Sequence, residues 1–534
     1  MVPRGGDETS FLLRDKVFNR AVSNILQRSE RQRDADKLVD IYVDVGIVPQ
    51  LENNNNQIIY GRRGTGKTHI FKVLQKKFEE EEGTSAIYID CRVLGSTAQF
   101  SDDTYPMSVR CLALFRDFMT IVHNELLNLI THSSSADAEK VFDLLYRLSN
   151  AFSVDREKIV KEEMVVVEKN KLAYSAGLEG SFDLAGGALK PTLGGAAESG
   201  KDVTERFKIN LADKVIFGDI HYYVKEILSI LQYKLVLLVD EWSSLPLDIQ
   251  PYFSEFIKRS FFANELVVVK IASLEYRSEF NVSFKGGILG FEPGADISIA
   301  LDIDDYYVYD RNPDQISNLF LDIIYRHIKS ELPQGYFETI KGIHSSRMFA
   351  WDVFTTDKVY NELARAAEGV VRDLINIFTN AFFDTVRRSR DRIDQRSILE
   401  AARGWFEKDK NEALDIPLRD LLSKIINEVI GHRSARSFLL PNELQKHPSI
   451  QKLFDLRVLH LVQRGYADKD NPGKRYNIYT LDYGTYVDLL KTSRQPRDYV
   501  AIENSNDGDW IVPFDDKRRI RRIVLTSEFI DGNV

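Results

Sequence analysis

One short stretch of the sequence has the composition and spacing of a phosphate-binding loop. Residues Gly61 to Thr68 fit the pattern G-x-x-x-x-G-K-[ST] without a mismatch. The glycines let the backbone N–H groups face the phosphates, Lys67 adds a positive charge for the outer phosphates, and Thr68 offers a hydroxyl to Mg²⁺. The residues expected to contact ATP are Gly61, Arg62, Arg63, Gly64, Thr65, Gly66, Lys67, Thr68 and the adjacent His69.

A pair of acidic residues ends another apolar segment, the third along the chain. Leu235 to Val239 is uninterrupted by polar residues, and Asp240 and Glu241 follow it directly. In such a pair the first acid can organise Mg²⁺, and the second can orient or deprotonate a water molecule. We therefore expect Thr68 and Asp240 to hold the metal, and Glu241 to act in catalysis together with Lys67. A protein that binds ATP but hydrolyses it slowly, or not at all, could keep both acids.

Two further residues are weaker candidates for contacts with the terminal phosphate. Ser273 closes a fourth apolar segment and is expected beside Asp240. Arg372, in the sequence Gly-Val-Val-Arg-Asp-Leu, is a candidate for a catalytic arginine that reaches the phosphates from a helix. The alternatives are an ordinary serine at a strand end and a solvated charge on a helix face.

The segments that carry these residues predict an α/β fold. Gln57 to Tyr60 is a short apolar strand that runs into the loop, and an amphipathic helix, His69 to Glu81, follows it. Further strands are expected at Ala86 to Asp90, Leu235 to Val239 and Leu266 to Ile271, with helical stretches between them. Apolar strands that alternate with helices indicate a parallel sheet flanked by helices, which binds ligands at the carboxyl ends of its strands.

The composition is that of a soluble protein, with 43% hydrophobic and 28% charged residues. No run approaches the roughly 18 apolar residues of a membrane span, and the N-terminus lacks the apolar stretch of a secretory signal. We therefore expect a cytoplasmic protein without a membrane partner. The cysteines, Cys91 and Cys111, are too few for a disulfide or metal framework. A net charge of -9 argues against a chain-wide surface for nucleic acid.

The sequence patterns divide the chain into five parts. The expected parts are an N-terminal helical segment (1–38), a P-loop core (39–312), a helical lid (313–410), a C-terminal winged-helix domain (411–492) and a tail (493–534). Within the core, residues 175–201 are rich in Gly, Ala and Ser, which is typical of a mobile loop or loose hairpin. This insertion is either an adaptation without chemistry or a contact loop for a partner.

The C-terminal part has the order of elements of a winged helix. Its third helix is expected at Pro448 to Arg464, and a strand at Lys474 to Leu481. In nucleic-acid readers the third helix enters the major groove, but here it is mostly apolar. We therefore weigh two alternatives equally for this unit: contact with DNA, and a protein contact or purely structural role. The side chains available for DNA phosphates are Lys452, Arg457, Arg464, Lys469, Lys474 and Arg475, with Tyr466, Tyr476 and Tyr479 interleaved.

Taken together, these motifs resemble the AAA+ superfamily, and within it the initiator branch of origin-recognition and Cdc-type replication proteins. By this resemblance Ser273 is the first sensor and Arg372 the second. The glycine-rich insertion and Trp242 depart from the pattern. The chain looks most like the bacterial initiator-like ATPases, which are often found in mobile or defence cassettes. The similarity lies in the phosphate loop, the strand leading into Cys91-Arg92, the Leu235–Trp242 segment, Ser273, the helix around Arg372 and the C-terminal unit.

The resemblance also implies a homo-oligomer. AAA+ sites commonly need an arginine from a neighbouring subunit to sense the terminal phosphate. Arg277 and Arg259 are candidates for this role, and an ordinary surface charge is the alternative for each.

Two functions from different classes are compatible with the sequence. The first is an ATP-binding and ATP-hydrolysing switch that cycles between ATP and ADP, assembles, and engages DNA or a partner protein. The second is a signalling or scaffold ATPase, similar to the STAND proteins of antiviral defence systems, in which the nucleotide is a structural clasp and a partner protein is the effector. No nucleophile elbow or His/Cys cluster in the sequence supports a separate effector activity.

Overall fold

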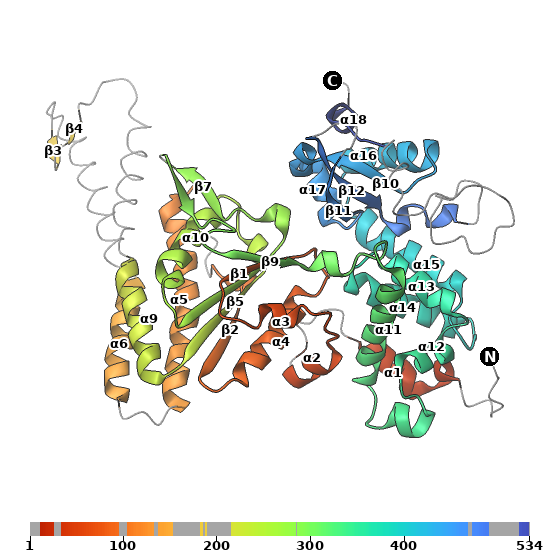
Figure 1. Ribbon diagram of the computed structural model, residues 1–534, viewed down its shortest axis with the longest axis horizontal. Coiled ribbons are helices and arrows are strands. Elements are labelled where there is room, and N and C mark those ends of the chain that lie inside the picture. Colours follow the sequence, from red (N-terminus) through yellow and green to blue (C-terminus); the bar gives the residue numbers. More distant parts are fainter. Residues whose placement is uncertain are drawn as a thin grey trace, which may run out of the picture.

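The computed structural model places a sheet-containing body at one end of the molecule, and a helical lid and the C-terminal unit at the other (Figure 1). The N-terminal helix α1 (Lys16–Asn24) lies beside the lid helices rather than beside the sheet. The residues that the structure describes are 11–25, 32, 34–95, 104–132, 137–152, 182–184, 187–189, 215–284, 286–467, 473–490 and 523–532.

A five-stranded parallel sheet forms the centre of the first body. The strand order is β2-β5-β6-β1-β9, so the expected parallel sheet is confirmed. The fifth strand, β9, was not predicted, because it is short, follows a glycine-containing stretch and lies at the sheet edge, where Ile299 is half exposed. The strands are β1 (Gln57–Tyr60), β2 (Thr84–Asp90), β5 (Lys234–Asp240), β6 (Val267–Ser273) and β9 (Ser298–Asp302).

Alternate residues of the strands face two separate hydrophobic layers. Ile59 and Val236 pack into the layer that contains α4 (Lys67–Glu79), whereas Ile58 and Leu235 pack into the opposite layer. Burial on both faces explains why these strands are continuously apolar. The helices of the opposite layer are α5 (Met107–His132), α6 (Ala138–Phe152), α9 (Phe217–Leu231) and α10 (Gln250–Ile257).

Polar residues gather where the parallel strands end. Asp90 of β2 pairs in register with Asp240 of β5. Tyr60 of β1 pairs with Ser273 of β6 on one side and with Asp302 of β9 on the other. The loop that follows Tyr60 therefore begins at the same edge of the sheet as the acidic pair.

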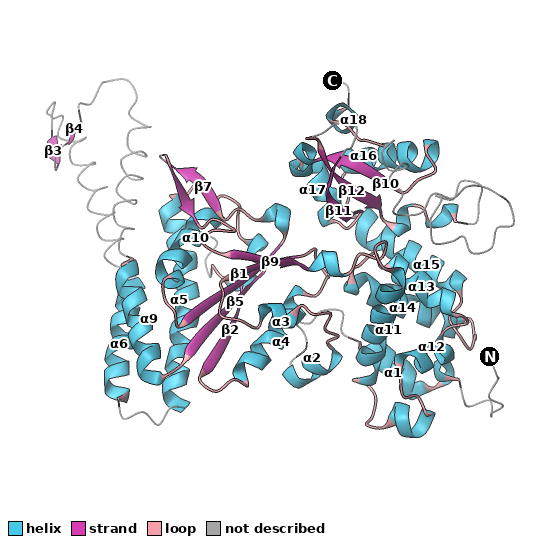
Figure 2. Ribbon diagram, viewed as in Figure 1, coloured by secondary structure: helices cyan, strands magenta, loops and turns pink. Residues whose placement is uncertain are grey.

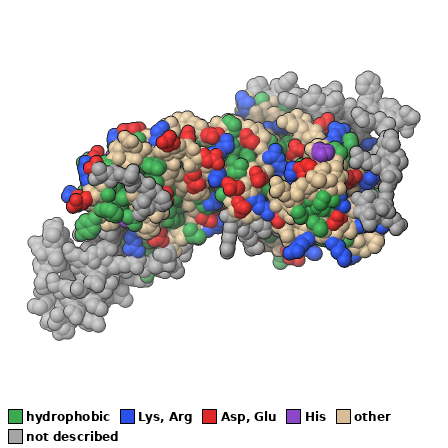
Figure 3. Space-filling model, turned by 90° about the horizontal axis from the view of Figure 1, so that it is seen from below, with side chains coloured by type: hydrophobic (Ala, Val, Ile, Leu, Met, Phe, Trp, Pro, Cys, Tyr) green, Lys and Arg blue, Asp and Glu red, His purple; other side chains and the backbone are tan. Residues whose placement is uncertain are grey.

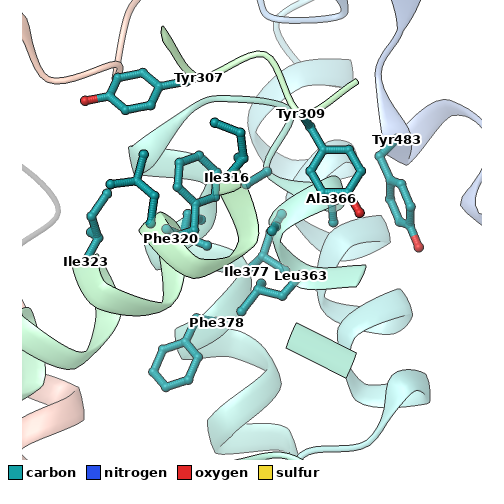
Figure 4. Packing of buried hydrophobic residues seen from close by; sticks show 14 of the residues in the cluster. Tyr307, Tyr309, Ile316, Phe320, Ile323, Leu363, Ala366, Ile377, Phe378 and Tyr483 are labelled. Carbon is teal, nitrogen blue, oxygen red and sulfur yellow. The ribbon is translucent and has the colours of Figure 1, made fainter. Parts of the chain in front are cut away.

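The lid is a helical bundle that includes the N-terminal segment. The Phe18 ring of α1 lies 5.6 Å from that of Phe382 and 6.2 Å from that of Phe337. Figure 4 shows buried side chains of three lid helices packing together, with Tyr483 of the C-terminal unit beside Tyr309. The lid helices are α11 (Pro313–Lys329), α12 (Ser346–Val353), α13 (Asp357–Ala366), α14 (Val371–Arg387) and α15 (Gln395–Trp405), and two short helices, α2 (Ala35–Ile41) and α3 (Val48–Leu51), lead from α1 to β1.

The C-terminal unit contains an antiparallel three-stranded sheet in the order β10-β12-β11 (Figure 2). The prediction of a third helix that continues to Arg464 is wrong, because that helix, α17, ends at Asp455. Arg457 takes a positive φ of 60°, and the apolar residues that follow pair as a strand with β12. The elements are α16 (Ile416–Ile426), β10 (Ser437–Pro441), α17 (Pro448–Asp455), β11 (Leu459–Ala467) and β12 (Arg475–Leu481).

The insertions and the tail are described in part. Most of the glycine-rich segment 175–201 lies outside the described residues, except for a short antiparallel pair, β3 (Phe182–Leu184) and β4 (Gly187–Leu189). A hairpin of β7 (Asn281–Phe284) and β8 (Gly287–Gly290) follows β6. The end of the expected polar tail folds back onto the C-terminal sheet, where Leu439 exchanges backbone hydrogen bonds with residues 523 and 525 before α18 (Ser527–Asp531). No helix in the described part of the chain is both long and apolar enough to cross a membrane.

Candidate nucleotide-binding site

The phosphate loop connects β1 to α4, and its conformation explains its glycines. Gly64 and Gly66 have φ angles of 87° and 104°, which side chains rarely tolerate. The buried Lys67 amine donates to the carbonyl oxygens of Gly61 at 2.6 Å and Arg62 at 2.9 Å. Burial lowers the pKa of Lys67, and nearby Asp240 opposes this effect. The amine lies inside the loop, where it can reach phosphate oxygens.

Thr68 and Asp240 meet beside this loop. The Thr68 hydroxyl donates to Asp240 Oδ2 at 2.6 Å, and the backbone N–H of Glu241 donates to Oδ1 at 2.8 Å. Mg²⁺ prefers oxygen ligands and is usually held by one or two protein carboxylates together with phosphate oxygens. A hydroxyl and a fully buried carboxylate in contact therefore fit a magnesium ion that is shared with ATP.

Tyr88 of β2 is a further partner of Asp240. Its hydroxyl donates to Asp240 Oδ2 at 2.9 Å, and the Lys72 amine lies 3.6 Å from the centre of its ring. Partners of this kind orient a metal-binding side chain. Sequence reasoning missed Tyr88 because a tyrosine in an apolar strand is usually a packing residue.

Glu241 has the features of a functional carboxylate. Its φ of 55° is uncommon for a residue other than glycine, and such conformations cluster at functional sites. Burial raises the pKa of Glu241, and the charge of Asp240 adds to this effect, whereas Lys67 and Arg92 oppose it. Arg92 Nη1 lies 3.9 Å from Glu241 Oε1. A raised pKa brings a general base closer to neutral pH, which favours proton transfer from water.

A cavity of about 320 Å³ opens beside the loop. Ligand sites typically measure roughly 300–1,000 Å³, so this volume is at the lower end of that range. The lid closes part of the cavity, because the backbone N–H of Arg372 donates to the Gly64 carbonyl oxygen at 3.1 Å. The predicted residues that line the cavity are Arg63, Gly64, Gly66, Lys67, Thr68, His69, Glu241 and Arg372.

Another part of the cavity wall consists of residues that the sequence did not identify. Leu38 and Ile41 come from α2, His327 from α11 and Ile375 from α14. His69 Nε2 lies 2.7 Å from the carbonyl oxygen of Leu38. Burial lowers the pKa of both histidines, to about 4 for His327, so they are neutral at pH 7. The apolar side chains and neutral imidazoles suit a planar nucleotide base, and the ion pair of Lys37 and Glu331 lies in the same wall.

The family model described as ORC-CDC6-like matches residues 28–355, which is more than half of the 534-residue chain. The chain belongs to the ORC-CDC6-like family. This assignment confirms the resemblance to AAA+ P-loop ATPases of the initiator branch and makes the chain an ATP-binding protein in general terms. No curated protein is similar enough to the chain to count as a match.

Solved structures similar to this ORC-CDC6-like chain include three archaeal proteins. Cdc6p of Pyrobaculum aerophilum has 11% identity and a TM-score of 0.33 over 88% of this chain and 97% of its own. The Aeropyrum pernix ORC1 protein in complex with DNA has 14% identity and a TM-score of 0.30 over 87% and 93%. A Walker-type ATPase of Pyrococcus abyssi has 11% identity and a TM-score of 0.35 over 87% and 97%. All three TM-scores are below 0.5, so the family assignment rests on the sequence match.

Several predicted residues of this ORC-CDC6-like site, Asp240 among them, have side chains that do not line the cavity. Ser273 is fully buried at the end of β6, where its hydroxyl is hydrogen-bonded to that of Ser278. Arg62 points away from the cavity, and its Nε donates to Asp304 Oδ2 at 3.1 Å. The expected contact of Arg62 with ATP is therefore restricted to its backbone. Thr65 is likewise buried, with its hydroxyl on the Arg62 carbonyl oxygen at 2.8 Å.

Several cations that were expected to contact DNA are committed to contacts within the chain. Arg457 is buried and bonds Asp373 and Asp409, and Arg464 bonds Glu275 and Asp302. In this arrangement both guanidinium groups are occupied by carboxylates of the chain, and their contact with DNA phosphates stays a prediction. Tyr466, Tyr476 and Tyr479 are buried as well, Lys469 lies outside the described residues, and Lys452, Lys474 and Arg475 are exposed.

Proposed function

We propose that this protein is a Mg²⁺-dependent ATPase that uses ATP binding and hydrolysis to switch between two arrangements of its core, lid and C-terminal unit. The observation that supports this most is the contact of Thr68 with Asp240 beside the Lys67 amine, with Glu241 on the cavity wall. A cation, the Thr68 hydroxyl and a base thus line one cavity, and Asp240 is bonded to that hydroxyl.

Each residue has a separate task in this proposal. Lys67 leaves its two carbonyl partners and binds the outer phosphates, and the loop N–H groups surround them. Bound Mg²⁺ supplies charge neutralisation on the phosphate oxygens. Thr68 and Asp240 hold the ion, and Glu241 orients the attacking water and takes its proton. Arg372 reaches the phosphates from the first turn of α14.

The switch follows from where the cavity lies. Its walls come from the core, the lid and the N-terminal segment, so a bound nucleotide contacts all three. A ligand shifts a conformational equilibrium only by its differential affinity for the two states. ATP and ADP differ in the phosphate that faces Glu241 and Arg372, and that difference sets the two states apart.

Assembly into a homo-oligomer is the second part of the proposal. A neighbouring copy would supply an arginine to the terminal phosphate. Arg259 is 57% exposed and forms an ion pair with Glu255, four residues earlier, at 2.6 Å, so it can reorient at little cost. Arg277 is bonded to Asp455 of α17, and that contact has to open before Arg277 can reach another subunit.

Engagement of DNA is the third part, and it is confined to one edge of the C-terminal unit. Lys474 and Arg475 are exposed where β12 begins, at the turn between β11 and β12. Acidic and basic side chains are interspersed over the face of the molecule drawn in Figure 3, which is seen from below. Phosphate contacts of this kind give affinity without sequence readout.

The experiment that tests the ATPase measures ATP hydrolysis with and without duplex DNA. Glu241→Gln is expected to keep ATP binding and to lose at least about 100-fold in turnover, because it removes the base. Lys67→Ala is expected to lose ATP binding, and the exposed Glu82→Gln serves as the control. Unchanged turnover in Glu241→Gln would overturn the role of this residue. If nucleotide instead co-purifies and the wild type shows no turnover, the nucleotide is a structural clasp for a partner protein.

A further inference from the structure

A chain of buried charged side chains leads from the phosphate loop into the C-terminal unit. The Arg62 side chain is hydrogen-bonded to His460 Nδ1 of β11. The other ring nitrogen of His460, Nε2, donates to Asp482 Oδ1 at 2.9 Å, and Asp482 directly follows β12. Arg62 can donate this bond only if Nδ1 of His460 carries no proton, so the imidazole is neutral. Burial and the Arg62 charge lower the pKa of His460 to about 3.

The same chain continues into the lid and returns to the loop. Lys410, at the end of the lid, bonds Asp482 and also Asp373 Oδ2, the latter at 2.9 Å. Asp373 follows Arg372 in α14, and the Arg372 N–H lies on the Gly64 carbonyl oxygen. The five charged or polar residues of this chain, which we call the latch, are at most 5% exposed: Arg62 5%, His460 3%, Asp482 2%, Lys410 2% and Asp373 0%.

The third helix of the C-terminal unit docks on the core next to the latch. The Phe454 ring of α17 lies 5.3 Å from the Tyr276 ring. The Arg62 guanidinium lies 5.6 Å from the centre of the Phe454 ring. The next residue, Asp455, is bonded to Arg277 of the core. The side of α17 that carries Phe454 and Asp455 is therefore covered by the core.

The loop residue Arg62 connects the latch to the phosphates. Its carbonyl oxygen accepts a hydrogen bond from Lys67, while its side chain holds Asp304, His460 and the carbonyl oxygen of Glu368. When Lys67 turns to a phosphate, the Arg62 carbonyl loses this donor. The carbonyl keeps the hydrogen bond from the Thr65 hydroxyl at 2.8 Å, so the departure of Lys67 loosens the Arg62 peptide group and, through it, the side chain that holds the latch.

We propose that phosphate binding at the loop and closure of the latch are alternative states, so that ATP releases α17 and the C-terminal unit from the core. This inference rests on the proposed ATP binding and names what that binding regulates. Linkage makes the relation reciprocal, because breaking the latch must raise the affinity for ATP by the same factor by which ATP favours the open state. Couplings between protein sites typically amount to about 5- to 150-fold.

The test combines hydrogen exchange of α17 with nucleotide affinity. A non-hydrolysable ATP analogue with Mg²⁺ is expected to increase deuterium uptake of peptide 448–455 in the wild type but not in Lys67→Ala. His460→Leu removes the link between Arg62 and Asp482 but leaves each with another charged partner. It is expected to show high uptake without nucleotide and to bind the analogue about 5-fold or more tightly. Arg433→Ala, an exposed change in the same unit, is the control.

The outcomes separate the latch from the proposed function. If the wild type binds the analogue while α17 uptake stays unchanged, or if His460→Leu binds it no more tightly, the latch is overturned and the ATPase stands. If the wild type does not bind the analogue, the proposed function itself fails. Should His460→Leu not fold, Asp455→Asn, which breaks the half-exposed contact with Arg277, carries the same test.

Discussion

The backbone N–H of Arg372 donates to the carbonyl oxygen of Gly64 at 3.1 Å, so that the first turn of α14 lies directly on the phosphate loop. The two residues are so close that a Cβ at position 64 would lie 2.8 Å from the Cβ of Arg372. Glycine is therefore needed at this position for two reasons, the φ of 87° and the approach of the lid.

Gly64→Ala is expected to push the lid away from the loop and to weaken ATP binding by about 10-fold or more, since about 1.4 kcal/mol corresponds to 10-fold and the strained φ and the clash each cost that order. Titration with a fluorescent ATP analogue measures the change. Gly46→Ala is a matched control, because Gly46 has a similar φ of 84° but no atom within 4 Å of the added Cβ. Equal losses of affinity in the two variants would show that the lid contact has no effect.

Tyr88→Phe is expected to raise the Mg²⁺ concentration needed for half-maximal ATPase activity by about 10-fold. The variant removes only the hydroxyl that donates to Asp240, so the carboxylate keeps its charge but loses an orienting partner. The measurement is a Mg²⁺ titration of turnover at saturating ATP. Tyr222→Phe, on the exposed face of α9, is the comparison, and a Mg²⁺ requirement unchanged in both variants contradicts the role of Tyr88.

Much of the core was predictable because it depends on local pattern. The loop, β1 and the acidic pair follow one another in the chain, and continuous apolar segments identify buried parallel strands. The adjacency of Ser273 to the Asp240 strand also followed from strand order. At Val458 to Val462, however, periodicity cannot separate a buried strand from a buried helix, and the expected third helix was extended too far.

The rest of the site could not be predicted because it depends on distant segments. Leu38 and Ile375 meet at the cavity although more than half of the chain separates them. Arg62 precedes Arg63, which lines the cavity, but its own side chain turns to Asp304 of the core and to His460 of the docked C-terminal unit. Neither relation leaves a signal in spacing or composition.

Arg92→Ala is expected to shift the acid limb of the ATPase pH profile to higher pH. Burial and Asp240 raise the pKa of Glu241, and Arg92 is one of the two cations that lower it. Glu241 acts as a base only when ionised, so activity is present above its pKa and is lost as the pH falls through it. Removal of Arg92 raises that pKa further. The measurement is kcat/KM against pH, with the surface variant Arg147→Ala as the control, and an acid limb that moves to lower pH contradicts the assignment.

Lys410→Met is expected to reduce the free energy of unfolding by about 3–5 kcal/mol at pH 8, because it leaves two buried carboxylates without their shared cation. In the wild type, burial raises the pKa of Asp373 and Asp482, but Lys410 and its neighbours outweigh burial and hold both values below the usual range. Their contribution to stability is therefore complete above the unfolded-state pKa of about 3.9 and is lost as the pH falls through the folded-state values.

Without Lys410, burial raises the pKa of Asp482, whereas Arg457 still lowers that of Asp373, so protonation of Asp482 relieves the uncompensated charge as the pH falls. The difference in unfolding free energy between the wild type and Lys410→Met is therefore expected to be largest at pH 8 and to shrink at pH 5. Urea denaturation at the two pH values measures it, with the exposed Lys424→Met as the control. A difference that is the same at both pH values, or larger at pH 5, would show that Lys410 stabilises the protein by packing and not by its charge.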